Sequence, residues 1–295
     1  MRRALAAGTA VGALALVAAG AGLWTQRNAL GARLVADALA RRGVPANVKL
    51  TRLDPRGAEG SLVVGPAGDP DLVVPHLRVS FAAWPPPGGG PPRVTGVTLD
   101  HPHLRARWDG RRLTFGALQP LVDEALRAKP GGPPGPDIEV RDGLLSLSTA
   151  SGPAQARGDV RLHAGRLATA DLRVSAAAVA ERGVRVRDFS GRIAARAEAD
   201  RLKLRAELAA ASVRADAGAA QAPRLELHAD LPYGRDAQSL LNGHVAAEAV
   251  LVAAEAQGGG ARLVRSRADA RFDGVLDRGG EHVVGTADLA LAAAA

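Results

Sequence analysis

The sequence contains no cysteine, which excludes disulfide bonds, thiolate metal sites and cysteine nucleophiles. Aromatic residues make up only 3%, and they are not interleaved with the arginines, which argues against a nucleic-acid surface. Lysine occurs only at Lys49, Lys129 and Lys203, so arginine carries most of the net charge of +8. Arginines that alternate with Leu or Val are typical of a solvated strand face. A basic surface of this kind favours anionic lipid headgroups.

The sequence also lacks the motifs of common enzymes. There is no G-x-S-x-G, no P-loop, no H-E-x-x-H and no G-x-G-x-x-G before an expected helix. His101 and His103 are the only close histidine pair, and no carboxylate cluster surrounds them. Polar residues at the start of a strand therefore explain them better than a metal site does. Carboxylates such as Asp109, Asp142 and Asp188 fall at expected turns. We expect no enzyme, no cofactor and no metal.

The N-terminus carries the clearest single segment. An uncharged run from residue 4 to residue 26 follows Arg2 and Arg3 and contains Trp24 near its end. The run is long enough to cross a bilayer, so residues 1–26 predict a membrane anchor, with a signal peptide cleaved near Ala21 as the alternative. Arginines lie on both sides of the run, but long domains translocate largely regardless of charge. We expect residues 25–295 to lie outside the cytoplasm.

After the anchor the periodicity changes twice. Residues 27–44 predict an amphipathic helix that packs on the sheet or lies on the membrane, and from Pro45 onward the pattern has period two. A second helix is expected at 117–128, and the Pro/Gly-rich segments 85–92 and 129–136 are expected to be loops at the ends of the sheet. Strands are expected at 47–53, 60–65, 71–82, 93–100, 103–109, 111–116, 137–141, 143–149, 155–163, 166–175, 183–188, 190–197, 200–208, 223–230, 243–253, 261–273 and 281–291.

These elements predict a mainly β fold. We expect an elongated, curved antiparallel β-sheet, a gutter or groove of repeated short strands, with an N-terminal transmembrane helix and one or two short helices. The segment RLKLRAEL at 201–208 alternates so regularly that one face of the sheet must be dry. Residues 45–295 then form one β-groove domain, or a fragment of a longer repeat domain. Stacked at about 4.8 Å each, seventeen strands make a sheet about 80 Å long.

The stretch 103–116 predicts a β-hairpin around an Asp109-Gly110 turn. Its apolar set either lines a ligand groove or packs under the helix at 117–128. Both can hold if the helix closes one end of the groove. The apolar set comprises Leu104, Ala106, Trp108, Leu113 and Phe115, and the polar set comprises His103, Arg105, Arg107, Arg112 and Thr114.

Two stretches resemble a known family. VTGVTLDHPHLRARWDGRRLTFGALQPLV at 94–122 and GSLVVGPAGDPDLVVPHLRVSF at 60–81 resemble the AsmA-like envelope proteins, in particular the YdbH-like branch. From about residue 150 the resemblance rests on strand style alone. It implies an anchored β-gutter whose concave apolar face carries phospholipid acyl chains between the inner and outer membranes of a bacterium. The implied location is the inner membrane, single-pass, with the bulk of the chain in the periplasm. The implied partners are phospholipid, the inner membrane and other envelope proteins.

The acyl chains would lie on the apolar side of the strands, and rim arginines would meet the phosphate. A six-residue strand spans about 20 Å. Two alternatives remain: a closed, self-packed β-scaffold that binds envelope proteins, and a carbohydrate-binding or adhesive domain, which the scarcity of tryptophan opposes. The expected groove residues are Val97, Leu99, Leu104, Ala106, Trp108, Leu113, Phe115, Leu145, Leu147, Leu202, Leu204, Leu225 and Leu227.

Overall fold

The computed structural model describes residues 28–82, 93–126, 135–181, 183–234, 242–277 and 282–294, apart from Leu30 and Leu34. The expected anchor at 1–26 and most of the expected loops at 85–92 and 129–136 lie outside these residues. Within the described ranges, no helix has the length and apolar character needed to span a membrane.

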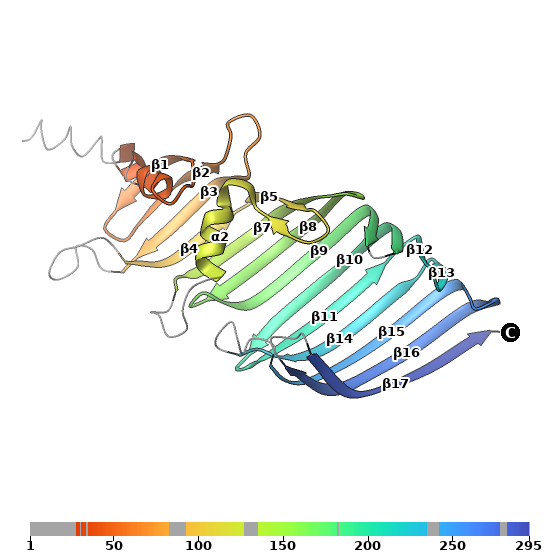
Figure 1. The fold of residues 1–295 in the computed structure, drawn as a ribbon. Coiled ribbons are helices and arrows are strands. Elements are labelled where there is room, and N and C mark those ends of the chain that lie inside the picture. The colour runs from red at the N-terminus through yellow and green to blue at the C-terminus, as the bar shows by residue number, and fades with distance from the viewer. Residues whose placement is uncertain are drawn as a thin grey trace, which may run out of the picture.

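The mainly β class is confirmed, because the described residues form one curved, seventeen-stranded sheet with few helices (Figure 1). The described residues from 28 to 40 are helical, and the second helix is a 3-10 turn, η1 (Gly116–Leu118), followed by α2 (Gln119–Leu126). The strands are β1 (Ala46–Asp54), β2 (Gly57–Val64), β3 (Leu72–Phe81), β4 (Val94–Asp100), β5 (His103–Trp108), β6 (Leu113–Thr114), β7 (Asp137–Thr149), β8 (Gly152–His163), β9 (Arg166–Glu181), β10 (Val184–Glu198), β11 (Arg201–Ala209), β12 (Ser212–Ala215), β13 (Gly218–Gln221), β14 (Arg224–Pro232), β15 (Gly243–Gly258), β16 (Ala261–Asp277) and β17 (His282–Ala294).

The sheet is not purely antiparallel, which corrects the expectation from the sequence. β4 and β5 both pair with β7 in parallel, with Val97 opposite Ile138 and Leu104 opposite Leu145. The segment containing β6, η1 and α2 lies between them in the chain, and parallel neighbours need such a crossover connection. β4 and β5 lie end to end beside β7, separated by a break at His101, whose φ is 52°.

The sheet has fewer strand positions than strands. β4 with β5, β11 with β12 and β13 with β14 each occupy one position, and the short β6 pairs with β5 on the side that faces β3. The seventeen strands therefore fill thirteen successive strand positions across the sheet, which we call rungs. The sheet is about 60 Å long rather than 80 Å. The rungs are correspondingly longer than expected. The expected strands 137–141 and 143–149 are one strand, β7, and 183–188 and 190–197 are one strand, β10.

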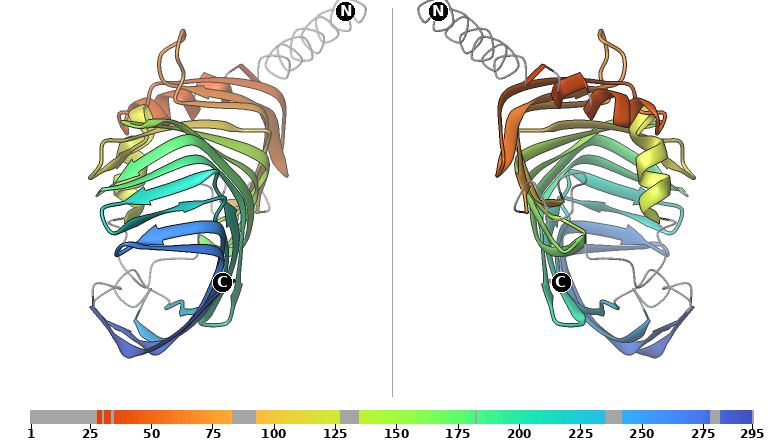
Figure 2. Two further views of the ribbon diagram at one scale, coloured as in Figure 1. Left: turned by 90° about the vertical axis from the view of Figure 1, so that its right-hand side faces the viewer. Right: turned by 90° about the vertical axis from the view of Figure 1, so that its left-hand side faces the viewer.

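The best-buried residues lie at the N-terminal end of the sheet. Val44, Val64 and Val74 are fully buried. A Cβ atom added to Gly31, in the helix at 28–40, would lie 2.9 Å from Leu53 and 3.1 Å from Leu50 on β1. The side chain of Pro120 in α2 lies beside Gly43, just after that helix. The side views in Figure 2 show the sheet bent into a trough with α2 on its open side. The helices thus cover the beginning of the sheet.

Candidate apolar binding surface

One line of residues crosses the whole sheet without a polar side chain. Residues directly opposite one another in neighbouring strands project to the same face. Starting from Leu50 on β1, the strand registers connect one residue in each rung as far as β17. The line contains Leu50, Gly60, Leu77, Leu99, Val140, Val160, Ala170, Ala195, Leu204, Ala229, Ala247, Phe272 and Ala287. We call the side of the sheet that bears this line the apolar face, and the other side the charged face.

Parallel lines on the same side are equally apolar over the second half of the sheet. Across β10, β11, β14, β15, β16 and β17, one such line contains Ile193, Ala206, Leu227, Ala249, Ala270 and Leu289. The next contains Gly191, Leu208, Leu225, Leu251, Ala268 and Leu291. The apolar face is therefore a continuous hydrocarbon surface and not a set of separate patches.

The strand registers bring twelve of the thirteen expected groove residues onto this face. These are Val97, Leu99, Leu104, Ala106, Trp108, Leu113, Leu145, Leu147, Leu202, Leu204, Leu225 and Leu227. The exception is Phe115, because β6 ends at Thr114 and Phe115 is the residue before η1. Its backbone N–H donates to Oε1 of Gln119 at 3.0 Å. Phe115 therefore belongs to the connection into α2 and not to the sheet surface.

The cover over the apolar face changes along the molecule. Val64 and Val74 near the helices are 0% exposed, whereas Leu251 on β15 is 40% exposed and Leu291 on β17 is 72% exposed. Among the described elements, no second layer of helix or sheet lies over β10 to β17. Large apolar side chains there, such as Leu251 and Leu291, are open to solvent or to a ligand, whereas Ala206, Val245 and Ala253 are buried.

The apolar face is the inner side of the bend. β8 alternates strictly between half-buried residues, which belong to the apolar face, and exposed residues on the charged face. Side chains converge on the concave side of a curved sheet, so they shield one another even without a covering layer. The surface can therefore hold an apolar chain against several strands at once.

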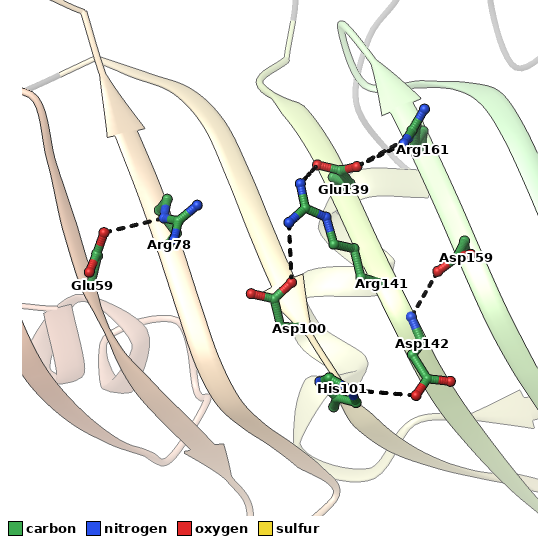
Figure 3. Close-up of polar contacts among 9 residues, drawn as sticks. All are labelled: Glu59, Arg78, Asp100, His101, Glu139, Arg141, Asp142, Asp159 and Arg161. Carbon is green, nitrogen blue, oxygen red and sulfur yellow. Dashed lines mark hydrogen bonds and ion pairs between the residues drawn. The ribbon is translucent and has the colours of Figure 1, made fainter.

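The charged face is held together by ion pairs across the strands (Figure 3). Glu139 accepts hydrogen bonds from Arg141 at 2.7 Å and Arg161 at 3.1 Å, and Arg141 also lies 3.7 Å from Asp100. The hydrogen bond from Arg141 is the main reason that the pKa of Glu139 lies below its ordinary value. A face of this kind prefers water to lipid.

The two histidines that the sequence singles out have separate partners. His101 lies 3.5 Å from Asp142, whereas His103 Nε2 is 2.9 Å from the Ser146 hydroxyl. Asp142 also accepts two hydrogen bonds from Arg157, each at 2.7 Å, and these lower its pKa. Among the described residues, no group of three or more metal-binding side chains forms a candidate metal site.

One contact was missed in the sequence. Tyr233, the single tyrosine of the chain, is 8% exposed and follows directly after β14. Its hydroxyl accepts the backbone N–H of Leu167 at 2.8 Å, and Arg166 lies over its ring at 4.7 Å. Arg166 also donates to the carbonyl oxygens of Tyr233 and Gly234, each at 2.9 Å. This cluster, which we call the Tyr233 latch, joins β9 to the end of β14 across two intervening rungs. Its only sequence signal is the single tyrosine.

The geometry can be compared with known proteins. A family model described as YdbH-like, intermembrane phospholipid transport protein YdbH, matches residues 14–291. Searches of curated proteins and of solved structures gave no match. The family match confirms the resemblance seen in the sequence. It also extends that resemblance through the C-terminal half, where the repeated pattern of short alternating strands was the only basis for it.

Proposed function

Since the chain belongs to the YdbH-like family, described as intermembrane phospholipid transport proteins, we propose that acyl chains lie along its apolar face during transport between membranes. The observation that carries the proposal is the line of thirteen residues, one per rung, without a polar side chain. Such a surface lets a lipid leave a bilayer while its methylenes stay out of water, which is worth about 0.8 kcal/mol for each methylene.

The dimensions of the sheet suit this role. β9 and β15 have 16 residues each, so they span about 50 Å along their curved course. One leaflet of a bilayer has a hydrocarbon thickness of about 15 Å. The apolar face is therefore wide enough for both acyl chains of a phospholipid.

The proposal includes a location. Residues 1–26 anchor the protein in the bacterial inner membrane, and residues 45–295 form the groove domain in the periplasm. The helix at 28–40 and α2 cover the end of the apolar face that follows the anchor in the chain, so they control where lipid enters. Partners in the envelope then receive lipid from the open C-terminal part.

Two neighbouring residues on β15 provide a matched test. Leu251 is 40% exposed on the apolar face, and Val252 is 41% exposed on the charged face. Val252 lies between Arg224 and Arg267 in the adjacent strands, so an aspartate there has favourable neighbours. An aspartate at Leu251 instead places a carboxylate against hydrocarbon.

The measurement is the amount of phospholipid that co-purifies with the full chain, determined by mass spectrometry. We expect Leu251→Asp to lower the bound phospholipid several-fold and Val252→Asp to leave it at the wild-type level. Equal lipid contents in the two variants would contradict the proposal. A folded wild-type protein without lipid would favour the alternative of a β-scaffold that binds envelope proteins.

A further inference from the structure

A hollow of about 340 Å³ lies at one edge of the sheet. This edge, which we call the hairpin rim, contains the β5–β6, β7–β8 and β12–β13 turns and the ends of β9 and β10. Apolar atoms predominate in the lining of the hollow, and its volume is at the lower end of the range for ligand sites. It is lined by Trp108, Gly110, Thr149, Ala150, Ser151, Val179 and Ala180.

Hydrogen bonds hold the walls of the hollow in place. The hydroxyl of Ser151 accepts the backbone N–H of Ala180 at 2.9 Å, which ties the β7–β8 turn to β9. On the other wall, Oδ1 of Asp109 accepts the backbone N–H groups of Arg111 at 2.8 Å and Arg112 at 2.7 Å. The Asp109 carboxylate thus stabilises the β5–β6 turn to which it belongs. The hollow is therefore largely formed before any ligand arrives.

Arginines that have no acidic partner among the described residues flank the hollow. Arg111 follows the lining residue Gly110, and Arg185 is directly opposite the lining residue Ala180. Arg214 is directly opposite Arg185 in the next strand, and like charges in that position destabilise a sheet. Within the described part of the chain, none of these three arginines lies in an ion pair. Their positive charges favour the binding of an anion at this edge.

The opposite edge differs. There, Arg166 donates to the backbone carbonyls of the Tyr233 latch, and Arg201 donates to Asp230 at 2.8 Å and to the His244 carbonyl at 2.6 Å. These guanidinium groups are already occupied. Arg56 and Arg93 at this opposite edge also lie in no ion pair among the described residues, so the hairpin rim is distinguished by two directly opposed arginines, Arg185 and Arg214, beside a hollow.

We propose that the hairpin rim binds the phosphate of a glycerophospholipid, with the glycerol and first methylenes in the hollow and the acyl chains on the apolar face. Trp108 links the two surfaces, because it lines the hollow and is one of the groove residues that the strand registers bring onto the apolar face. Arginine binds phosphate through paired, charge-assisted hydrogen bonds. This inference rests on the proposed function and adds to it that the headgroups follow one rim of the sheet.

The test uses the full chain, stripped of lipid in mild detergent, and two labelled probes. One probe is phosphatidylglycerol, and the other is dioleoylglycerol, which has the acyl chains but no phosphate. The double variant Arg185→Gln/Arg214→Gln is compared with Arg56→Gln/Arg93→Gln, which removes two exposed arginines from the opposite edge. We expect the first variant to bind phosphatidylglycerol about tenfold more weakly and dioleoylglycerol as the wild type does. The control variant binds both probes as the wild type does.

The outcomes separate the two proposals. Unchanged phosphatidylglycerol binding by Arg185→Gln/Arg214→Gln would overturn the headgroup site alone. A wild-type protein that binds neither probe would overturn the proposed function and this inference with it.

Stability gives a second readout. Because the arginine pair repels when no ligand is bound, the lipid-free double variant should unfold at the wild-type temperature or above. A lower unfolding temperature would mean that the two arginines are structural, and would also overturn the inference.

Discussion

Glu139 illustrates how single residues on the charged face join neighbouring strands. Its carboxylate accepts hydrogen bonds from Arg141 on its own strand and from Arg161 on β8, and its side chain is only 26% exposed (Figure 3). Most other ion pairs on this face are more exposed, and exposed pairs contribute little to stability. Glu139 is therefore a carboxylate on which a pH effect should be visible.

We expect Glu139→Gln to lower the unfolding temperature at pH 7. The pKa of Glu139 is lowered from its ordinary 4.5, so its contribution is complete above pH 4.5 and is lost as the pH falls through the lowered value. The difference between variant and wild type should therefore disappear at low pH, as measured by circular dichroism. The control Glu124→Gln, at a 61% exposed position 3.9 Å from Arg42, should have little effect at either pH. A destabilisation by Glu139→Gln that is equal at pH 7 and pH 3 would contradict this explanation.

At the scale of elements, the Tyr233 latch connects strands that the sheet itself does not pair. Among the described residues, the hydroxyl of Tyr233 is the hydrogen-bond partner of the backbone N–H of Leu167 at this turn. Removing it leaves that N–H without its partner, which costs about 1 to 3 kcal/mol.

We therefore expect Tyr233→Phe to lower the free energy of unfolding by about 1 to 3 kcal/mol in denaturant titrations. The ring stays in place under Arg166, so the loss reports on the hydrogen bond alone. Phe189→Leu on β10, away from the latch, provides a comparison that removes aromatic packing instead. Unchanged stability of Tyr233→Phe would show that the latch does not hold the rungs together.

The elements also show what sequence reasoning could and could not find. Alternation identified most strands, and the Asp109-Gly110 turn was placed correctly, because both signals are local. Asp142 and Asp188 were interpreted as turns, but they are single residues with φ of 48° and 52° inside continuous strands. β12 and β13 were missed because four residues are too few to show a period. The parallel pairing of β7 depends on the crossover through α2, which no local pattern encodes.

At the scale of the whole molecule, the sheet separates hydrocarbon from charge over thirteen rungs. The side of the sheet on which Leu204 or Leu227 lies was predictable from alternation, since a strand has a period of two. The location of the hollow was not, because Trp108 and Val179 are brought together only by the curved sheet. Nor was the gradient in cover, which runs from the fully buried Val74 to the open Leu291 and depends on where the helices pack.

The most direct measurement is photocrosslinking in bacterial membranes, with a benzophenone amino acid placed at single positions of the full chain. Leu204 and Leu289 sample the middle and the end of the apolar face, and Lys203 and Asp288 are their neighbours on the charged face. We expect phospholipid to crosslink at Leu204 and Leu289 and not at Lys203 or Asp288. Equal crosslinking on both faces, or none on the apolar face, would contradict the role of this surface in phospholipid transport.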